Sequence, residues 1–262
     1  MASHALGPYG MLRAAGSALG WPPNCAAMAP MPLLPTPTRR LAVRGAIALA
    51  VFWLPLAGSA RAAPDWPDSF TARLAAQALV QELRADLLSE PSATATLERW
   101  CRVHTIAPEA RITAARQHDA AVPPSAEQRA RLQIDAAEPV GYRHVRLICG
   151  GVVLSEAENW YVPSRLTQEM NRVLDSTDTP FGKAVQALAF KRATLSSRLL
   201  WRPLPEDWAT VPPDGTGGVL GVPAQILQNR ALLSRGTDGL PFAEVVETYT
   251  SGILAFPLPL PH

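Results

Sequence analysis

Apolar residues recur along the chain at two different spacings, which predict helices and strands in different segments. In residues 65–86 the apolar side chains return mostly at every fourth position, a spacing typical of an amphipathic helix. A second helix is expected over residues 92–101, with Ser92 or Thr94 as its N-cap. Further helical segments are expected at residues 125–132, 164–174 and 179–189.

Other segments are bounded by glycine or proline and predict strands, which lie at residues 111–115, 141–149, 152–162, 226–234 and 242–250. The pair Gly150-Gly151 is a turn signal between two of these strands, so we expect a hairpin there. The last two strands form a second hairpin. Long antiparallel hairpins with helices gathered at one side predict an α+β fold with a central antiparallel sheet.

The N-terminal part of the chain has the order of regions found in a secretory signal. Arg39, Arg40 and Arg44 precede an apolar run at residues 46–57, which is shorter than the ~20 residues that a membrane-spanning helix needs. Small residues follow, and we expect cleavage after Ala62 or Ala63. Residues 1–63 would then be an extension and signal, and residues 64–262 a single periplasmic or secreted domain without a stable membrane span.

Three alternatives remain open for this region. Translation could start at Met28 or Met31, the arginine pair at residues 39–40 loosely matches a twin-arginine signal, and the apolar run could stay as an uncleaved anchor.

The composition of the chain limits the classes of binding partner and cofactor that we expect. The chain has 24 basic and 22 acidic residues, and five of the basic ones precede residue 64, where there is no acidic residue. The remaining domain is mildly acidic, so we expect no nucleic-acid partner. The five histidines are dispersed, so we expect no metal site and no cofactor. Cys101 and Cys149 either form a disulfide or are two buried thiols. We expect a monomer.

Five ordered segments resemble chorismate pyruvate-lyase. They are Leu-Leu-Ser-Glu-Pro-Ser-Ala-Thr from residue 87, Arg-His-Val-Arg-Leu-Ile-Cys from 143, Asn-Trp-Tyr-Val-Pro from 159, Thr-Pro-Phe-Gly from 179, and Gly-Leu-Pro from 239 with Glu-Thr-Tyr-Thr from 247. The set is also similar to effector-binding domains of certain bacterial transcription regulators, where they follow a DNA-binding domain that we do not expect here. The resemblance implies a sheet flanked by helices and an enclosed pocket for a small aromatic carboxylate.

The resemblance also implies that Arg143 holds the substrate carboxylate. Alternate strand residues share a face, so Arg143 lies with Val145 and Leu147. An arginine on an apolar face is costly unless it is paired, and a bound carboxylate would pair with it. A carboxylate of the protein itself is the alternative partner, and Arg146 is the alternative ligand-binding residue.

By the same resemblance, Glu247 matches the glutamate that contacts the hydroxyl end of the product in chorismate pyruvate-lyase. It shares a strand face with Val245 and Tyr249, and burial there would suit it to proton transfer. Glu244 lies on the opposite face and is the weaker candidate. The structural alternative is an ion pair of Glu247 with Arg143 or Arg230.

Three further positions complete the expected substrate site. Phe181 and Gly182 match the loop that lines the family's pocket, and Ala93 stands where the lyase has a methionine over the ligand, which enlarges or opens the pocket.

Two functions follow, and whether the chain is an enzyme stays open. With Arg143 and Glu247 as catalytic residues, it would eliminate pyruvate from chorismate or a related enolpyruvyl compound and release a hydroxybenzoate. Alternatively, it would be a non-catalytic periplasmic binding protein for a small aromatic carboxylate, which fits the export signal better because chorismate is cytoplasmic. A scaffold with a degenerate pocket is a third, weaker hypothesis.

Overall fold

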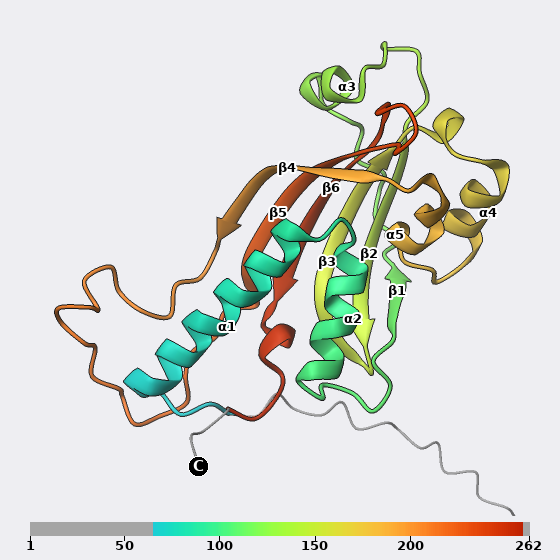
Figure 1. The fold of residues 1–262 in the computed structure, drawn as a ribbon. Helices are drawn as coiled ribbons and strands as arrows, with labels where there is room; N and C mark the ends of the chain where they lie inside the picture. The colour runs from blue at the N-terminus through green and yellow to red at the C-terminus, as the bar shows by residue number, and fades with distance from the viewer. Residues whose placement is uncertain (1–64, 259–262) are drawn as a thin grey trace, which may run out of the picture. The chain divides into compact units, whose positions relative to one another are not determined.

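A computed structural model describes residues 65–258, and the predicted signal and cleavage site lie outside them. Six strands form one antiparallel sheet in the order β1-β2-β3-β6-β5-β4 (Figure 1). Their bounds are β1 Ile112–Arg116, β2 Gly141–Cys149, β3 Val152–Tyr161, β4 Lys191–Leu199, β5 Gln225–Ser234 and β6 Pro241–Thr250. The expected α+β fold with a central antiparallel sheet is confirmed.

Helices α1 to α4 begin at polar side chains that cap their first turns, whereas α5 follows Pro180 and has no side-chain cap. The α-helices are α1 Phe70–Ser89, α2 Ala93–Val103, α3 Ala126–Leu132, α4 Gln168–Ser176 and α5 Phe181–Ala184, and 3₁₀ turns cover Pro163–Arg165, Gln186–Leu188 and Ser251–Leu254. Of the two predicted caps of α2, Ser92 is the one used, since its hydroxyl accepts from the Ala95 N–H at 3.3 Å. The first helix starts five residues later than predicted, because Ser69 caps it and Pro67 pairs with Val219.

One face of the sheet carries the core. Figure 1 shows α1 and α2 side by side across this face, with α4 and α5 beyond them. The apolar residues form two clusters, one under α1 and α2 and the other under α4 and α5. The first includes Leu83 and Leu97, and the second includes Phe181 and Phe242. Each cluster buries the apolar stripe of its helices, which is the main stabilising contribution in a layered fold.

The turn between β2 and β3 requires its glycines. Gly150 and Gly151 have φ values of +55° and +92°, a backbone region that other L-residues adopt rarely. A Cβ at Gly150 would also stand 2.1 Å from the Cβ of Ala107. The sequence signal for this hairpin therefore had a direct steric cause.

Strand β4 was not predicted from the sequence. Within the described part of the chain it pairs with β5 alone, and most of its residues are exposed. An edge strand of this kind lacks the alternation of buried and exposed positions from which strands are recognised. The predicted helix at residues 179–189 is correspondingly shorter, ending as a 3₁₀ turn before β4.

A long connection between β4 and β5 is fastened to the start of α1. The Asp68 carboxylate accepts from Arg73 Nε at 2.6 Å and from the Thr216 hydroxyl at 2.7 Å. Arg73 also donates to the carbonyl of Pro203 at 2.9 Å. These contacts hold the pKa of Asp68 at about 2, with the Arg73 hydrogen bond as the largest cause.

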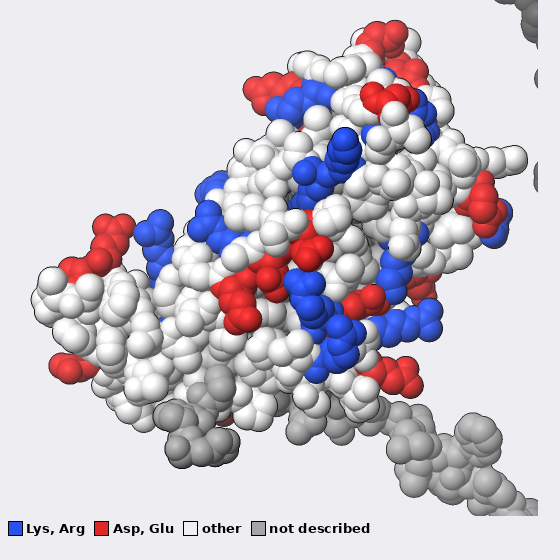
Figure 2. Space-filling view, viewed as in Figure 1, with Lys and Arg blue, Asp and Glu red and all other residues white. Residues whose placement is uncertain are grey.

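Charges of both signs are interspersed on the face that Figure 2 draws. Arg99 of α2 forms an ion pair with Asp86 of α1, with Nη2 at 2.9 Å from Oδ2. Over residues 65–258, no helix combines the length and apolar character that a bilayer crossing demands.

We predict that Asp68→Asn flattens the acid dependence of stability. The folded pKa of about 2 lies below the usual value of 3.8, so the stabilisation is complete above about pH 4 and is lost as the pH falls towards 2. Thermal unfolding between pH 2 and 6 should show a shallower decline for the variant than for the wild type. Parallel curves would contradict this role of Asp68.

Candidate functional site

A small cavity lies where the two apolar clusters meet, between the helices and the sheet. Centres of water molecules can occupy about 30 Å³ of it, which is room for about two waters. Its walls come from α2, α5, β4 and the central strands, and the lining residues are Pro91, Ser92, Ala93, Thr94, Val145, Leu147, Ala157, Asn159, Phe181, Gly182, Phe190, Arg192, Leu233, Val245 and Glu247.

The charged group in this cavity is a buried ion pair between Arg192 and Glu247. The Arg192 guanidinium donates twice, with Nη2 at 2.5 Å from Oε2 and Nη1 at 3.2 Å from Oε1. The two side chains are only 5% and 9% exposed. Burial lowers the pKa of Arg192, but the charge and hydrogen bonds of Glu247 outweigh it and raise that pKa overall, so Arg192 stays protonated.

Two more buried polar side chains surround the pair. The Tyr249 hydroxyl donates to Glu247 Oε2 at 3.0 Å, and burial raises the pKa of Tyr249 well above its usual value, so it remains a donor. Asn229 lies opposite Glu247 in the strand register, is fully buried, and finds no hydrogen-bond partner for its carboxamide among residues 65–258. The Nε of Arg192 is buried and unpartnered in the same sense.

The N-terminal turn of α2 borders the cavity. Ser92, Ala93 and Thr94 all line it, and Thr94 is buried. The first N–H groups of an α-helix have no partner within the helix and give this end a partial positive charge. Gly182 of α5 faces the turn, where a Cβ would stand 3.5 Å from the hydroxyls of both Ser92 and Thr94.

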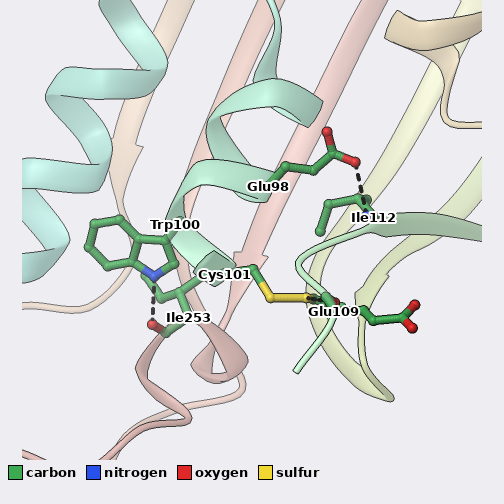
Figure 3. Close-up of a disulfide and its surroundings, with 7 residues drawn as sticks. Glu98, Trp100, Cys101, Glu109, Ile112 and Ile253 are labelled. Atoms are coloured by element: carbon green, nitrogen blue, oxygen red, sulfur yellow. Dashed lines mark hydrogen bonds between the residues drawn. A yellow bond between two sulfur atoms is a disulfide. The ribbon is translucent and has the colours of Figure 1, made fainter. Parts of the chain in front are cut away.

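Several contacts further along α2 fix the position of this turn (Figure 3). Cys101 forms a disulfide with Cys149 at the end of β2. Trp100 Nε1 donates to the carbonyl of Ile253 at 2.9 Å, and Glu98 accepts from the Ile112 N–H at 3.1 Å. The sequence left the pairing of the two cysteines open, and the structure shows the disulfide, a bond that oxidising compartments maintain.

Arg143 lies beside the cavity and not in its lining. Its side chain is on the same strand face as Val145, as predicted, and the residue is 2% exposed. Nη2 donates to the carbonyls of Thr177 and Thr179 at 3.2 and 3.0 Å, while Nε and Nη1 have no partner in the described part of the chain. Burial, followed by the charge of Arg116, lowers the pKa of Arg143 to about 10.

The structure thus brings together four of the five site residues expected from the sequence. Ala93, Phe181, Gly182 and Glu247 line one cavity, and Arg143 adjoins it through Asn159, its register partner. The alternative candidate Arg146 is on the other face of the sheet, paired with Glu156 at 3.1 Å.

Arg192 is the residue that sequence reasoning missed. Glu247 was expected to pair, if at all, with Arg143 or Arg230, but its partner is Arg192. Arg230 instead binds Glu244 at 2.8 Å, together with Arg131 at 2.7 Å, on the opposite face. The signal that could have found Arg192 is the uncompensated charge of an inward-facing Glu247, because a buried carboxylate requires a cation from another element.

No cluster of metal-ligating side chains occurs between residues 65 and 258.

The chain has a clear relative among known proteins. No family model matches the chain. The protein y4mC of Sinorhizobium fredii (strain NBRC 101917 / NGR234), described as an uncharacterized protein, is 47% identical over 199 residues, which are 75% of this chain and 84% of that protein.

Solved structures with a similar fold are much more distant in sequence. PhnF from Mycobacterium smegmatis has a TM-score of 0.43 at 10% identity, covering 66% of this chain and 70% of that one. The effector domain of the same protein has a TM-score of 0.41 at 10% identity, covering 61% and 88%. The possible transcriptional regulator YydK from Bacillus subtilis has a TM-score of 0.34 at 16% identity. The matched region covers 58% of this chain and 61% of that regulator. The similarity is one of fold.

These findings correct the functional expectations from the sequence. The structural neighbours include a possible transcriptional regulator and an effector domain, and they contradict both the predicted pyruvate-eliminating lyase and its alternative, a periplasmic protein that captures an aromatic carboxylate. The expected absence of a nucleic-acid partner is contradicted by the same neighbours. The site gives a physical reason against the lyase. Glu247, the predicted proton-transfer residue, already accepts hydrogen bonds from Arg192 and Tyr249 on its carboxylate. Export lies outside the described residues and stays a prediction.

We predict that Arg192 and Glu247 are strongly coupled in stability. Glu247→Gln or Arg192→Met leaves a buried charge without its partner and should cost about 3–5 kcal/mol of unfolding free energy. The double variant should cost clearly less than the sum of the two, because neither charge is left unpaired. Urea unfolding of all four proteins measures the cycle, and additive effects would show that the pair is not formed.

The disulfide should contribute to stability independently. It closes a loop across 48 residues of sequence, so Cys101→Ser with Cys149→Ser should lower the unfolding free energy by about 2–4 kcal/mol. Urea unfolding of the wild type with and without reductant provides the comparison. A wild type that is insensitive to reductant would mean that the two sulfurs are not bonded.

Proposed function

We propose that this chain, which belongs to the same family as the y4mC protein, is a small-molecule-binding domain whose ligand carries an anionic group. The cavity between α2, α5 and the sheet is the binding site. Arg192 lines it, and Arg143, which adjoins the lining through Asn159, adds a second buried positive charge.

The proposal rests on the incomplete hydrogen bonding of the buried Arg143 guanidinium. It is a buried cation whose partners within residues 65–258 are two backbone carbonyls, and two of its guanidinium nitrogens make no hydrogen bond. The pKa of about 10 keeps it charged at neutral pH. An unpaired buried charge is expensive, and an anion bound in the adjoining cavity would compensate it.

The surrounding charges also favour an anion. Among the buried side chains that the structure describes at this site, Arg143 and Arg192 bring two positive charges and Glu247 brings one negative charge. The N-terminal turn of α2 adds partial positive charge from the helix dipole. In the absence of a ligand the site therefore holds an excess of buried positive charge.

The remaining walls are suited to holding a compact group out of water. Val145, Leu147, Phe181 and Val245 are apolar, while Asn159 offers a carboxamide. A few polar groups set in an apolar cavity are typical of small-molecule sites.

The test is thermal unfolding of the full chain with sodium butanoate and sodium phosphate, against sodium chloride at equal ionic strength. At about ten times the dissociation constant, binding adds ~1.4 kcal/mol, which corresponds to a rise of roughly 3–6 °C. At least one anion should produce this rise in the wild type.

Arg146→Met is the matched control, because Arg146 lies three positions along the same strand on the opposite face. The control should keep the rise, Arg143→Met should lose it, and Arg143→Lys, which keeps the charge without the fork of donors, should retain part of it. An equal rise in Arg143→Met and the control, or no rise with either anion in the wild type, would refute the proposal.

A further inference from the structure

A second hollow adjoins the binding cavity on its outer side. It has about 350 Å³ of space for centres of water molecules, against about 30 Å³ in the inner cavity. Pro91, Ser92, Gly182 and Phe190 line both, so the two spaces meet between the start of α2 and α5. We call the outer space the groove. The inner cavity alone holds only a group the size of one or two waters, so most of an organic ligand would lie in the groove.

Gly182 keeps the connection open. Its backbone is helical, without the positive φ that would demand glycine, and a glycine within a helix costs stability relative to alanine. A Cβ there would contact Ser92, Thr94 and, at 3.9 Å, Phe190, so any longer side chain would project between the walls that the two spaces share. The glycine at this position is therefore explained by the space that it leaves open and not by its backbone conformation.

As far as residues 65–258 form it, the groove has mainly apolar walls and no unpaired charge. Pro91, Ala95, Ala189 and Phe190 line it together with Gln186, and its two ionic groups, Lys183 and Glu98, bind each other at 2.5 Å. Because that pair is already neutralised, the groove offers no counter-charge to a second ionic group of a ligand. Apolar surface entering it would be favourable in proportion to the area buried.

We propose that the ligand is elongated, with its anionic head in the inner cavity and an uncharged, apolar stem that passes Gly182 and lies along Ala95 and Phe190 in the groove. The ligand class is a straight-chain organic acid anion of medium length. This inference rests on the proposed function, which supplies the anionic head, and adds the stem and the groove.

The test is a homologous series of sodium butanoate, hexanoate and octanoate, with dissociation constants measured by NMR titration of the full chain. Affinity should rise along the series by up to about fourfold for each methylene that enters the groove. 1-Octanol, which has the stem without the charge, should bind more weakly than octanoate.

Ala95→Phe is the diagnostic variant, since Ala95 is exposed in the groove and a phenyl ring there would fill it. The affinity ratio of octanoate to butanoate should fall towards one in this variant. Ala85→Phe, at an exposed position of α1 away from the groove, is the matched control and should keep the wild-type ratio. A phenylalanine at an exposed helical position leaves the fold intact in both cases.

The outcomes separate the two proposals. If butanoate binds through Arg143 but the ratio is flat in the wild type or unchanged in Ala95→Phe, the elongated ligand is refuted and the anion site stands. If none of the three acids binds, the proposed function fails and this inference fails with it.

Discussion

The architecture depends on one buried ion pair. Arg192 comes from β4 and Glu247 from β6, so the pair reaches across β5, which lies between them. Among the described strands, β4 pairs with β5 alone, and most of its residues are exposed. The pair therefore fastens an edge strand to the middle of the sheet. Desolvating two charges is favourable only with good geometry and additional hydrogen bonds, which the bidentate contact and Tyr249 provide.

The same pair divides the core into two parts. An apolar cluster lies on either side of it, and the space around the charges is left as a cavity because neither cluster fills it. Helix α2 must be held firmly for this arrangement to persist, since its first turn is the cavity wall. The disulfide and the Trp100 and Glu98 hydrogen bonds supply that rigidity from the opposite end of the helix. Binding surfaces placed on rigid elements are pre-organised and lose less entropy when a ligand binds.

Much of the fold could be predicted because its strong signals are local. Both hairpins followed from glycine turns and β-branched residues, and strand parity put Arg143 and Glu247 on the inward face where they lie. The edge strand β4 could not be predicted in this way, because exposure on most of its positions removes the alternation on which such predictions rest. Missing β4 also meant missing Arg192. The ion pair of Glu247 joins residues 55 positions apart on strands with different burial, and no short-range pattern encodes it. The function assigned from resemblance failed for a related reason, since a shared fold does not fix the chemistry of its site.

The disulfide has a consequence for how the domain is made. The chain has three cysteines, and Cys101 and Cys149 are the two that fall within residues 65–258. Two thiols can join in one way only, whereas four allow three pairings. Oxidation of this segment therefore leads to a single covalent product. It needs an electron acceptor but no enzyme that reshuffles wrong bonds, so the slow isomerisation that limits the maturation of many cysteine-rich proteins has no counterpart within it.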